Sequence, residues 1–358
     1  MEKTFEKYFL AANSSEGFCE HFTDCYDFHD GWRAYIIKGG PGTGKSSLMK
    51  YVAKKATDKG YKVTLCVCSS DPLSLDGVII EDIKTVILDG TAPHVVEPKN
   101  PGICEEILNL GEFWDGDILR HNKERIYEIS ALNKAHHKLA SRYLFSAGEL
   151  MKDNLRLSRE FTDKNKIDKF ANGLCKRYIP VGEGKEKEQI RFIGGITPMG
   201  VISYLNTLAK TYKTKVIIED KYGGASGLLM EKVREYALKK GHSIITLKSP
   251  FLPSLLTDHI LIPELSLMFA TENEYNHIDS ADRRIHARRF TDLSLKKQYR
   301  SRMRFGDEVS RELLLGAVGA LSDAKREHDN LEKYYIKAMD FDSLTKYAMA
   351  ATEKILNP

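Results

Sequence analysis

The fold is decided by Tyr35–Lys62, whose sequence is YIIKGGPGTGKSSLMKYVAKKATDKGYK. Ala34–Lys38 is a short apolar run, typical of a buried β-strand. Gly39–Ser46, GGPGTGKS, matches the pattern G-x-x-x-x-G-K-[ST] in full. Apolar residues then recur at helical spacing as far as Gly60, where a left-handed residue is expected to end the helix. The stretch therefore predicts a strand, a glycine-rich loop and a helix, in that order.

This order is the context in which such a loop binds phosphate. Its glycines allow backbone conformations that a Cβ would forbid, so that the amides and the helix N-terminus converge on phosphate oxygens. We expect Lys45 to contact the β- and γ-phosphates of ATP and the Ser46 hydroxyl to contact Mg²⁺. The residues predicted to bind the nucleotide are Gly39, Gly40, Pro41, Gly42, Thr43, Gly44, Lys45, Ser46 and Ser47.

Such a site also needs a carboxylate at the end of a neighbouring strand, where it holds magnesium through water. Thr85–Asp89 offers four strand-forming residues followed by an aspartate. Lys45 and Asp89 are therefore the predicted catalytic residues, and Ser46 and Asp89 are the predicted metal ligands. The alternative is that Asp89 only begins a turn, with Asp71 as a competing carboxylate.

Other polar residues lie near the expected carboxyl edge of the sheet, where ligands bind in open α/β folds. Thr91 and His94 are candidates to sense the γ-phosphate or to position a water molecule, although a plain loop role is also open. Asp71 could cap the next segment, orient Lys45 or meet a second substrate. Glu81, Asp71 and His94 are all candidates for the general base, on position alone.

The chain repeats itself, because Tyr35–Lys62 aligns without a gap to Val216–Ser243. Each aligned core is followed by a long helical region, about Asp117–Asn172 and Ser294–Leu356, which we expect to form a hairpin. The Gly- and charge-rich stretch 180–189 reads as a linker between units 1–179 and 190–358. The similarity continues upstream in Phe9–Gly17 and Phe192–Gly200, and downstream in Gly77–Gly90 and His259–Thr271.

The second copy is degenerate. Ala225–Gly227 stands where the first copy has Gly44–Ser46, so the lysine and the metal-binding hydroxyl are both missing. The residue aligned near Asp89 is Ala270 or Thr271, neither of which is acidic. We therefore expect this half to keep the fold without hydrolysing a triphosphate.

Two further segments have open interpretations. Asp220 precedes the second loop, where its charge would repel phosphate, although Gly223 and Gly224 could hold a different anion. The basic segment 283–304, RRIHARRFTDLSLKKQYRSRMR, could be a solvated helix paired with acids. It could instead contact nucleic acid or an acidic protein partner, or deliver an arginine to the nucleotide in the first half.

Composition agrees with a folded soluble protein. Of the 358 residues, 42% are hydrophobic and 29% are charged, and the net charge of +4 is too small to argue for nucleic acid by itself. No apolar stretch is long enough to span a membrane, and no secretion signal is evident at the N-terminus. The six cysteines lack the spacing of a zinc site and are expected to be reduced thiols. Reduced thiols and the absence of a secretion signal together lead us to expect a cytoplasmic location.

GGPGTGKSSLMK, CSSDPLSLDGVII and ILDGTAPHVVEPKNPG together resemble an uncharacterised bacterial family of tandem P-loop ATPase-like proteins. The likeness extends to Ile260–Leu265 and Tyr334–Phe341. It implies ATP binding and hydrolysis, and a P-loop in the second half as well. This chain departs from the family pattern at Ser226 and Gly227, which puts a second ATP site in doubt.

The sequence thus predicts an α/β fold of two P-loop NTPase-like parallel-sheet units in tandem, each with a helical extension, docked as an internal pseudo-dimer. The leading functional hypothesis is a magnesium-dependent ATPase, a hydrolase that converts ATP to ADP and phosphate. One alternative is a small-molecule or nucleotide kinase, with Cys68–Gly77 lining the acceptor site. Another is a nucleotide sensor or scaffold without turnover.

Overall fold

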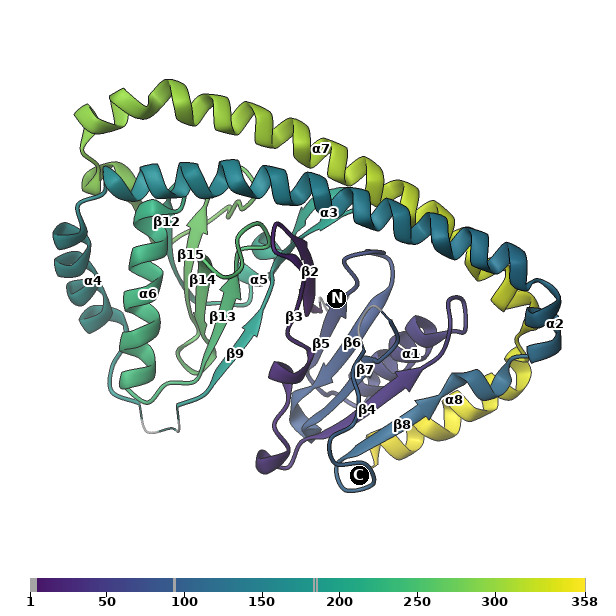
Figure 1. Ribbon diagram of the computed structural model, residues 1–358. Coiled ribbons are helices and arrows are strands. Elements are labelled where there is room, and N and C mark those ends of the chain that lie inside the picture. Colours follow the sequence, from purple (N-terminus) through teal and green to yellow (C-terminus); the bar gives the residue numbers. More distant parts are fainter. Residues whose placement is uncertain (1–4, 93–94, 183, 185, 358) are drawn as a thin grey trace.

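The computed structural model describes residues 5–92, 95–182, 184 and 186–357. It contains two six-stranded sheets flanked by helices, so the chain is an α/β protein made of two units in tandem (Figure 1). The two longest helices, α3 (Lys123–Glu160) and α7 (Leu293–Ala338), run antiparallel to each other across both units. Among the described helices, none is both long and apolar enough to cross a bilayer.

The first sheet has the strand order β1-β5-β6-β7-β4-β8. Strand β4 lies between β7 and β8. The glycine-rich loop follows β4 and leads into helix α1 (Lys45–Asp58). A small hairpin of β2 (Ala11–Ser14) and β3 (Gly17–Glu20) is separate from this sheet. The strands of the sheet are β1 (Glu6–Tyr8), β4 (Arg33–Lys38), β5 (Val63–Val67), β6 (Leu75–Ile80), β7 (Thr85–Asp89) and β8 (Glu105–Asn109).

The second sheet has the order β9-β13-β14-β15-β12-β16, which repeats the order of the first sheet strand for strand. Its hairpin consists of β10 (Gly194–Thr197) and β11 (Gly200–Ser203), and helix α6 (Gly224–Lys239) takes the place of α1. The short helix α5 (Leu205–Ala209) precedes the strand that leads to the second loop. The strands are β9 (Glu188–Arg191), β12 (Thr214–Glu219), β13 (Ile244–Lys248), β14 (Thr257–Ile262), β15 (Leu267–Glu272) and β16 (Arg283–His286).

The prediction of parallel sheets is wrong at one strand in each unit. β6 runs antiparallel to both of its neighbours, and so does β14, whereas the other neighbouring strands run parallel. The reason is the length of the connections, because parallel neighbours need a crossover of a dozen or more residues. Only residues 68–74 join β5 to β6, so the chain turns straight back.

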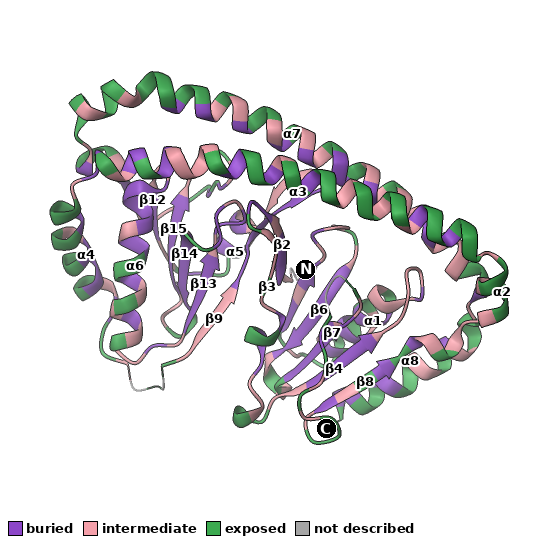
Figure 2. Cartoon of the chain, in the orientation of Figure 1, coloured by how far each residue is buried: buried purple, intermediate pink, exposed green. Residues whose placement is uncertain are grey.

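Burial follows the pattern expected of strands covered on both faces (Figure 2). In β4, Tyr35 and Ile37 pack toward α1, while Ala34 and Ile36 pack toward the other face, and all four are buried. Both core helices stop as predicted, since Gly60 and its counterpart Gly241 have φ angles of 89° and 80°.

The helical extensions differ from the expected hairpins, because each long helix pairs with the long helix of the other half. Beyond α3, the chain enters α4 (Lys164–Tyr178), which packs against α6 and the second sheet. Beyond α7, it enters α8 (Phe341–Leu356), which packs against α1 and the first sheet. The halves therefore exchange their terminal helices (Figure 1).

Backbone hydrogen bonds between the halves occur in reciprocal pairs. Phe9 and Phe192, which align in the repeat, donate to each other's carbonyls at 2.8 and 2.9 Å. Around the helix exchange, Asp115 donates to Ala338 and Asp340 donates to Phe113, both at 2.8 Å. The other end of α7 repeats this exchange of bonds, which relates the halves by an approximate two-fold axis. The matching donors are Asp163 to Phe290 at 2.8 Å and Asp292 to Phe161 at 2.7 Å.

Candidate functional site

The first loop, residues 39–44, joins the end of β4 to the start of α1. Gly42 and Gly44 have φ angles of 66° and 84°, which residues with a Cβ rarely adopt. A Cβ at Gly39 would lie 2.7 Å from the Thr43 hydroxyl oxygen, which itself donates to the Gly40 carbonyl at 2.8 Å. The glycines are thus required by the shape of the loop.

Lys45 begins α1 and turns its side chain back into the loop. Its Nζ donates to the carbonyls of Gly39 at 3.1 Å and Gly40 at 2.8 Å, and lies 3.7 Å from a carboxylate oxygen of Asp89. Both charged side chains are largely buried. The structure therefore brings together the two residues that were predicted to act in catalysis.

Asp89 ends β7, the strand next to β4, at the same edge of the sheet as the loop. Burial raises the pKa of Asp89, and the opposing effect of the Lys45 ammonium comes next in size. One of its oxygens accepts the Thr91 N–H at 2.9 Å. Thr91 thus lies beside the predicted carboxylate, whereas His94 lies outside the described residues.

Ser46 lies in the first turn of α1, and its hydroxyl accepts the N–H of Leu75 at 3.1 Å. This bond ties the helix to the start of β6. A hydroxyl and a carboxylate are hard oxygen donors, so Ser46 and Asp89 fit the ligand chemistry of Mg²⁺. No group of three or more His, Cys, Asp or Glu side chains within the described residues is arranged to hold a metal. Mg²⁺ here would thus depend on phosphate oxygens and water for its remaining ligands.

Asp76 is a residue of this site that sequence reasoning missed. It is the second residue of β6 and is 3% exposed. Burial raises its pKa to about 7, and the charges of Asp89 and Lys45 both act on it. The signal in the sequence was the repeat itself, because Asp258 directly precedes the aligned segment of the second half as Asp76 does in the first. In the structure Asp258 has the same place in β14, and burial raises its pKa to about 7 as well.

Two other candidates receive clear roles. Asp71 accepts the Leu73 N–H at 3.2 Å and the Ser74 hydroxyl at 2.8 Å, so the capping alternative is confirmed for this residue. Glu81 follows β6 and pairs with Lys62. Because β6 is antiparallel, Glu81 lies at the edge of the sheet opposite the loop, and its candidacy as general base is wrong.

Residues from the second half cover the first loop. A Cβ at Gly40 would lie 2.6 Å from the Tyr335 ring, and a Cβ at Gly42 would lie 3.0 Å from Ile336. Tyr335 and Ile336 belong to the last turns of α7. Leu344 of α8 approaches Gly44 in the same way, at 3.1 Å from an ideal Cβ.

The basic segment lies at the other end of α7. Arg304 precedes Tyr335, whose ring covers the loop, by 31 residues, which is about 47 Å along a helix, so the prediction that this segment delivers an arginine to the loop is wrong. The solvated, acid-paired interpretation holds for several members: Arg284 pairs with Glu272, Arg302 with Asp153 and Arg304 with Glu308.

The second loop, residues 220–223, is two residues shorter than the first. Asp220 turns back onto the start of α6, where its carboxylate accepts the N–H groups of Ala225 at 2.8 Å and Ser226 at 2.9 Å. The carboxylate thus occupies the amides that would otherwise face an anion. This contact disfavours the alternative that Gly223 and Gly224 bind one.

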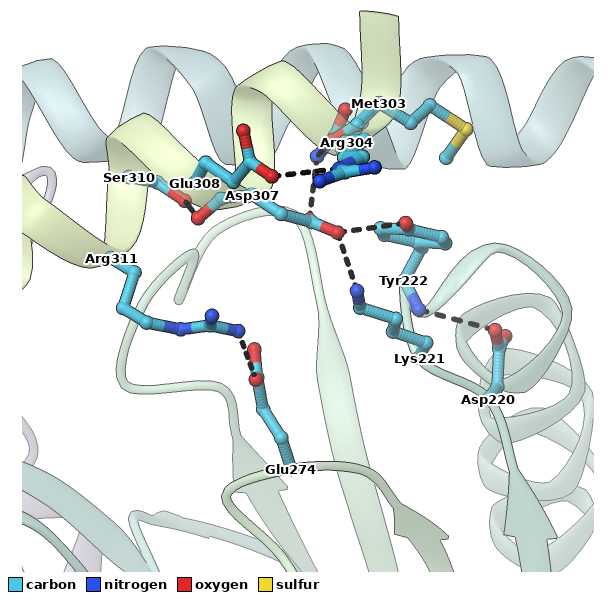
Figure 3. A network of polar contacts seen from close by, with 11 residues as sticks. Asp220, Lys221, Tyr222, Glu274, Met303, Arg304, Asp307, Glu308, Ser310 and Arg311 are labelled. Carbon is cyan, nitrogen blue, oxygen red and sulfur yellow. Dashed lines mark hydrogen bonds and ion pairs between the residues drawn. The ribbon is translucent and has the colours of Figure 1, made fainter. Parts of the chain in front are cut away.

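Figure 3 shows how the second loop is held from above. Lys221 forms an ion pair with Asp307 of α7, and the Tyr222 hydroxyl donates to the same carboxylate at 2.9 Å. A Cβ at Gly224 would lie 2.3 Å from the Ser158 hydroxyl of α3, so this loop is tightly covered.

Strand register and sequence alignment identify the counterparts of Lys45 and Asp89, the two residues predicted to act in catalysis. Ile37 pairs with Asp89 in the first sheet, and Ile218 pairs with Thr271 in the second, so Thr271 replaces the aspartate. Ser226 replaces Lys45 in the gapless alignment. The hydroxyls of Ser226 and Thr271 are buried and have no hydrogen-bond partner among the described residues.

Comparison of the chain with family models, curated proteins and solved structures gives no match. The resemblance to tandem P-loop ATPase-like proteins therefore stays a prediction, and function has to be argued from the geometry of the two loops.

Proposed function

We propose that the first half binds a nucleoside triphosphate with magnesium, with ATP as the expected nucleotide, and hydrolyses it. The observation that carries this proposal is the inward-turned Lys45, held by the glycine-rich loop and facing Asp89 at the end of the adjacent strand. Loop amides at a helix N-terminus and one ammonium form an anion site, and the neighbouring oxygens suit a hard cation.

In this proposal each residue has a limited task. Lys45 leaves the carbonyls of Gly39 and Gly40 and binds the β- and γ-phosphate oxygens. Ser46 and Asp89 would hold the magnesium. The bound cation would neutralise negative charge on the phosphates. The largely buried setting strengthens the Lys45 contact, because water screens it less than at the surface.

We prefer hydrolysis to transfer onto a second substrate because the two acids of the proposed acceptor segment, Cys68–Gly77, are already engaged in contacts of their own. Asp71 caps the turn within it, and Asp76 is buried beside Lys45 and Asp89.

The deciding experiment replaces Lys45 with alanine. We expect binding of Mg·ATP, measured by calorimetry, to weaken by at least about 100-fold, because a charge-assisted contact in a shielded site is lost. Lys54→Ala is the matched control, since Lys54 is an exposed lysine of the same helix. Equal affinities in the two variants would refute the site. A second assay, of phosphate release by the wild type, distinguishes an ATPase, which releases phosphate, from a sensor, which does not.

A further inference from the structure

The last turns of α7 make a contact with the first loop that the proposed function does not need. Besides the Tyr335 ring over Gly40, a Cβ at Gly42 would lie 3.1 Å from the Glu332 carbonyl oxygen and 3.2 Å from its Cβ. The helix backbone itself thus lies against the loop. It belongs to the half of the chain that has no catalytic lysine.

Glu332 places a negative charge on the loop. Its carboxylate lies close enough to the N–H of Gly42 to interact with it, and it lies 3.5 Å from the ring of His328, one turn earlier in α7. The neighbouring His328 ring, with smaller help from Lys325 and the Gly42 N–H, lowers the pKa of Glu332, which keeps it ionised. In a P-loop, amides of this kind are ligands of phosphate oxygens.

Two of the anion-binding groups of the loop therefore have contacts within the protein itself. The Gly42 amide lies close to the Glu332 carboxylate, and the Lys45 ammonium donates to two loop carbonyls. A phosphate at the Gly42 amide would meet the negative charge of Glu332, and the Tyr335 ring lies against Gly40 beside it.

We propose that the end of α7, from Glu332 to Ala338, is a gate over the P-loop that nucleotide must displace. This inference rests on the proposed function of the first half. Glu332 acts as an internal anion in the closed state, and a triphosphate takes its place in the open state. Because the closed state competes with nucleotide, the apparent affinity falls by the fraction of molecules that are open.

The gate is connected to the rest of the molecule by contacts that can report its movement. The rings of Trp114 and Tyr335 lie 5.8 Å apart, and Trp114 also bridges to Met339 at the end of α7. Lys325, two turns before Glu332, lies 3.6 Å from Asp71 in the loop after β5. Displacement of Tyr335 therefore changes the surroundings of Trp114.

The chain has two tryptophans, Trp32 and Trp114. The experiment uses the full chain with Trp32→Phe, so that Trp114 is the only tryptophan left. Titration with Mg·ATP is followed by Trp114 emission and, independently, by calorimetry. We expect a saturable emission change at the midpoint found by calorimetry. In Glu332→Gln, binding should tighten by about tenfold, because the competing charge is lost while the side-chain shape is kept.

Glu312→Gln is the matched control, being an exposed glutamate of α7 some 20 residues, or about 30 Å, from the gate residue Glu332. Its affinity should equal that of the Trp32→Phe protein. The gate would be overturned if Mg·ATP bound with measurable heat but left Trp114 emission unchanged. It would also be overturned if Glu332→Gln and Glu312→Gln bound Mg·ATP with equal affinity. Either result would leave the proposed function intact. Absence of heat in every variant would overturn both.

Discussion

The first loop spans six residues and is followed by a lysine, whereas the second spans four and turns an aspartate onto its own helix. The sheets beneath them are the same strand for strand. In each half a carboxylate lies at these amides: Asp220 accepts from the start of its own helix, and Glu332 of the opposite half lies close to the Gly42 amide. One scaffold thus supports an anion site filled by its own loop and, in our proposal, a displaceable one.

The largest expected effect tests the buried acids that the halves share. Burial raises the pKa of Asp76 and of Asp258 from 3.8 to about 7. Each is protonated at low pH, and folding stability falls as pH rises from about 4 through 7, because ionisation favours the unfolded chain. Since one pKa unit corresponds to about 1.4 kcal/mol, the penalty approaches about 4 kcal/mol.

The variants Asp76→Asn and Asp258→Asn remove this penalty one at a time. We expect each to gain stability relative to the wild type in urea unfolding at pH 8 and to gain little at pH 4. Only Asp76→Asn should also alter nucleotide binding, because only Asp76 lies near Lys45. A stability difference that is constant from pH 4 to pH 8 would contradict the assignment.

Asp89→Asn removes from the first half the carboxylate that the second half lacks, and tests whether turnover depends on it. We expect phosphate release to fall by about 100-fold, with affinity for Mg·ATP changed by less, because the amide is a poorer metal ligand than the carboxylate. The control is Asp58→Asn at the exposed end of α1. Equal losses of binding and turnover would argue against a metal role for Asp89.

Asp220→Ala tests whether the second loop is filled by its own carboxylate. Loss of a capping side chain costs about 1 kcal/mol of stability, and the amides of Ala225 and Ser226 should exchange hydrogen faster. Nucleotide stoichiometry should stay at one per chain. If the variant bound a second ATP, Asp220 alone would have been closing the site.

Ser226→Ala is expected to have the smallest effect. The Ser226 hydroxyl is buried without a hydrogen-bond partner among the described residues, so its removal should change stability by less than about 1 kcal/mol. Affinity for Mg·ATP should be unchanged. A clear drop in affinity would show that the second half takes part in nucleotide binding.

Local sequence was enough for the first loop and for the degeneration of the second. The glycine pattern, the flanking strand and the helix ending at Gly60 depend on residues close together in the chain, and the structure has all three. The repeat likewise predicted two related units. The reversed strand β6 was also within reach, because residues 68–74 are too few for a parallel crossover.

Long-range packing decided the rest. Periodicity predicts that α4 and α8 have an apolar face, but it does not say which sheet that face covers, and each covers the sheet of the other half. The proximity of Glu332 to Gly42 and of Asp76 to Lys45 joins segments far apart in sequence. The sequence by itself determined the chemistry of the loop, whereas the tertiary structure decided what lies over it, because helix pairing is a property of the whole fold.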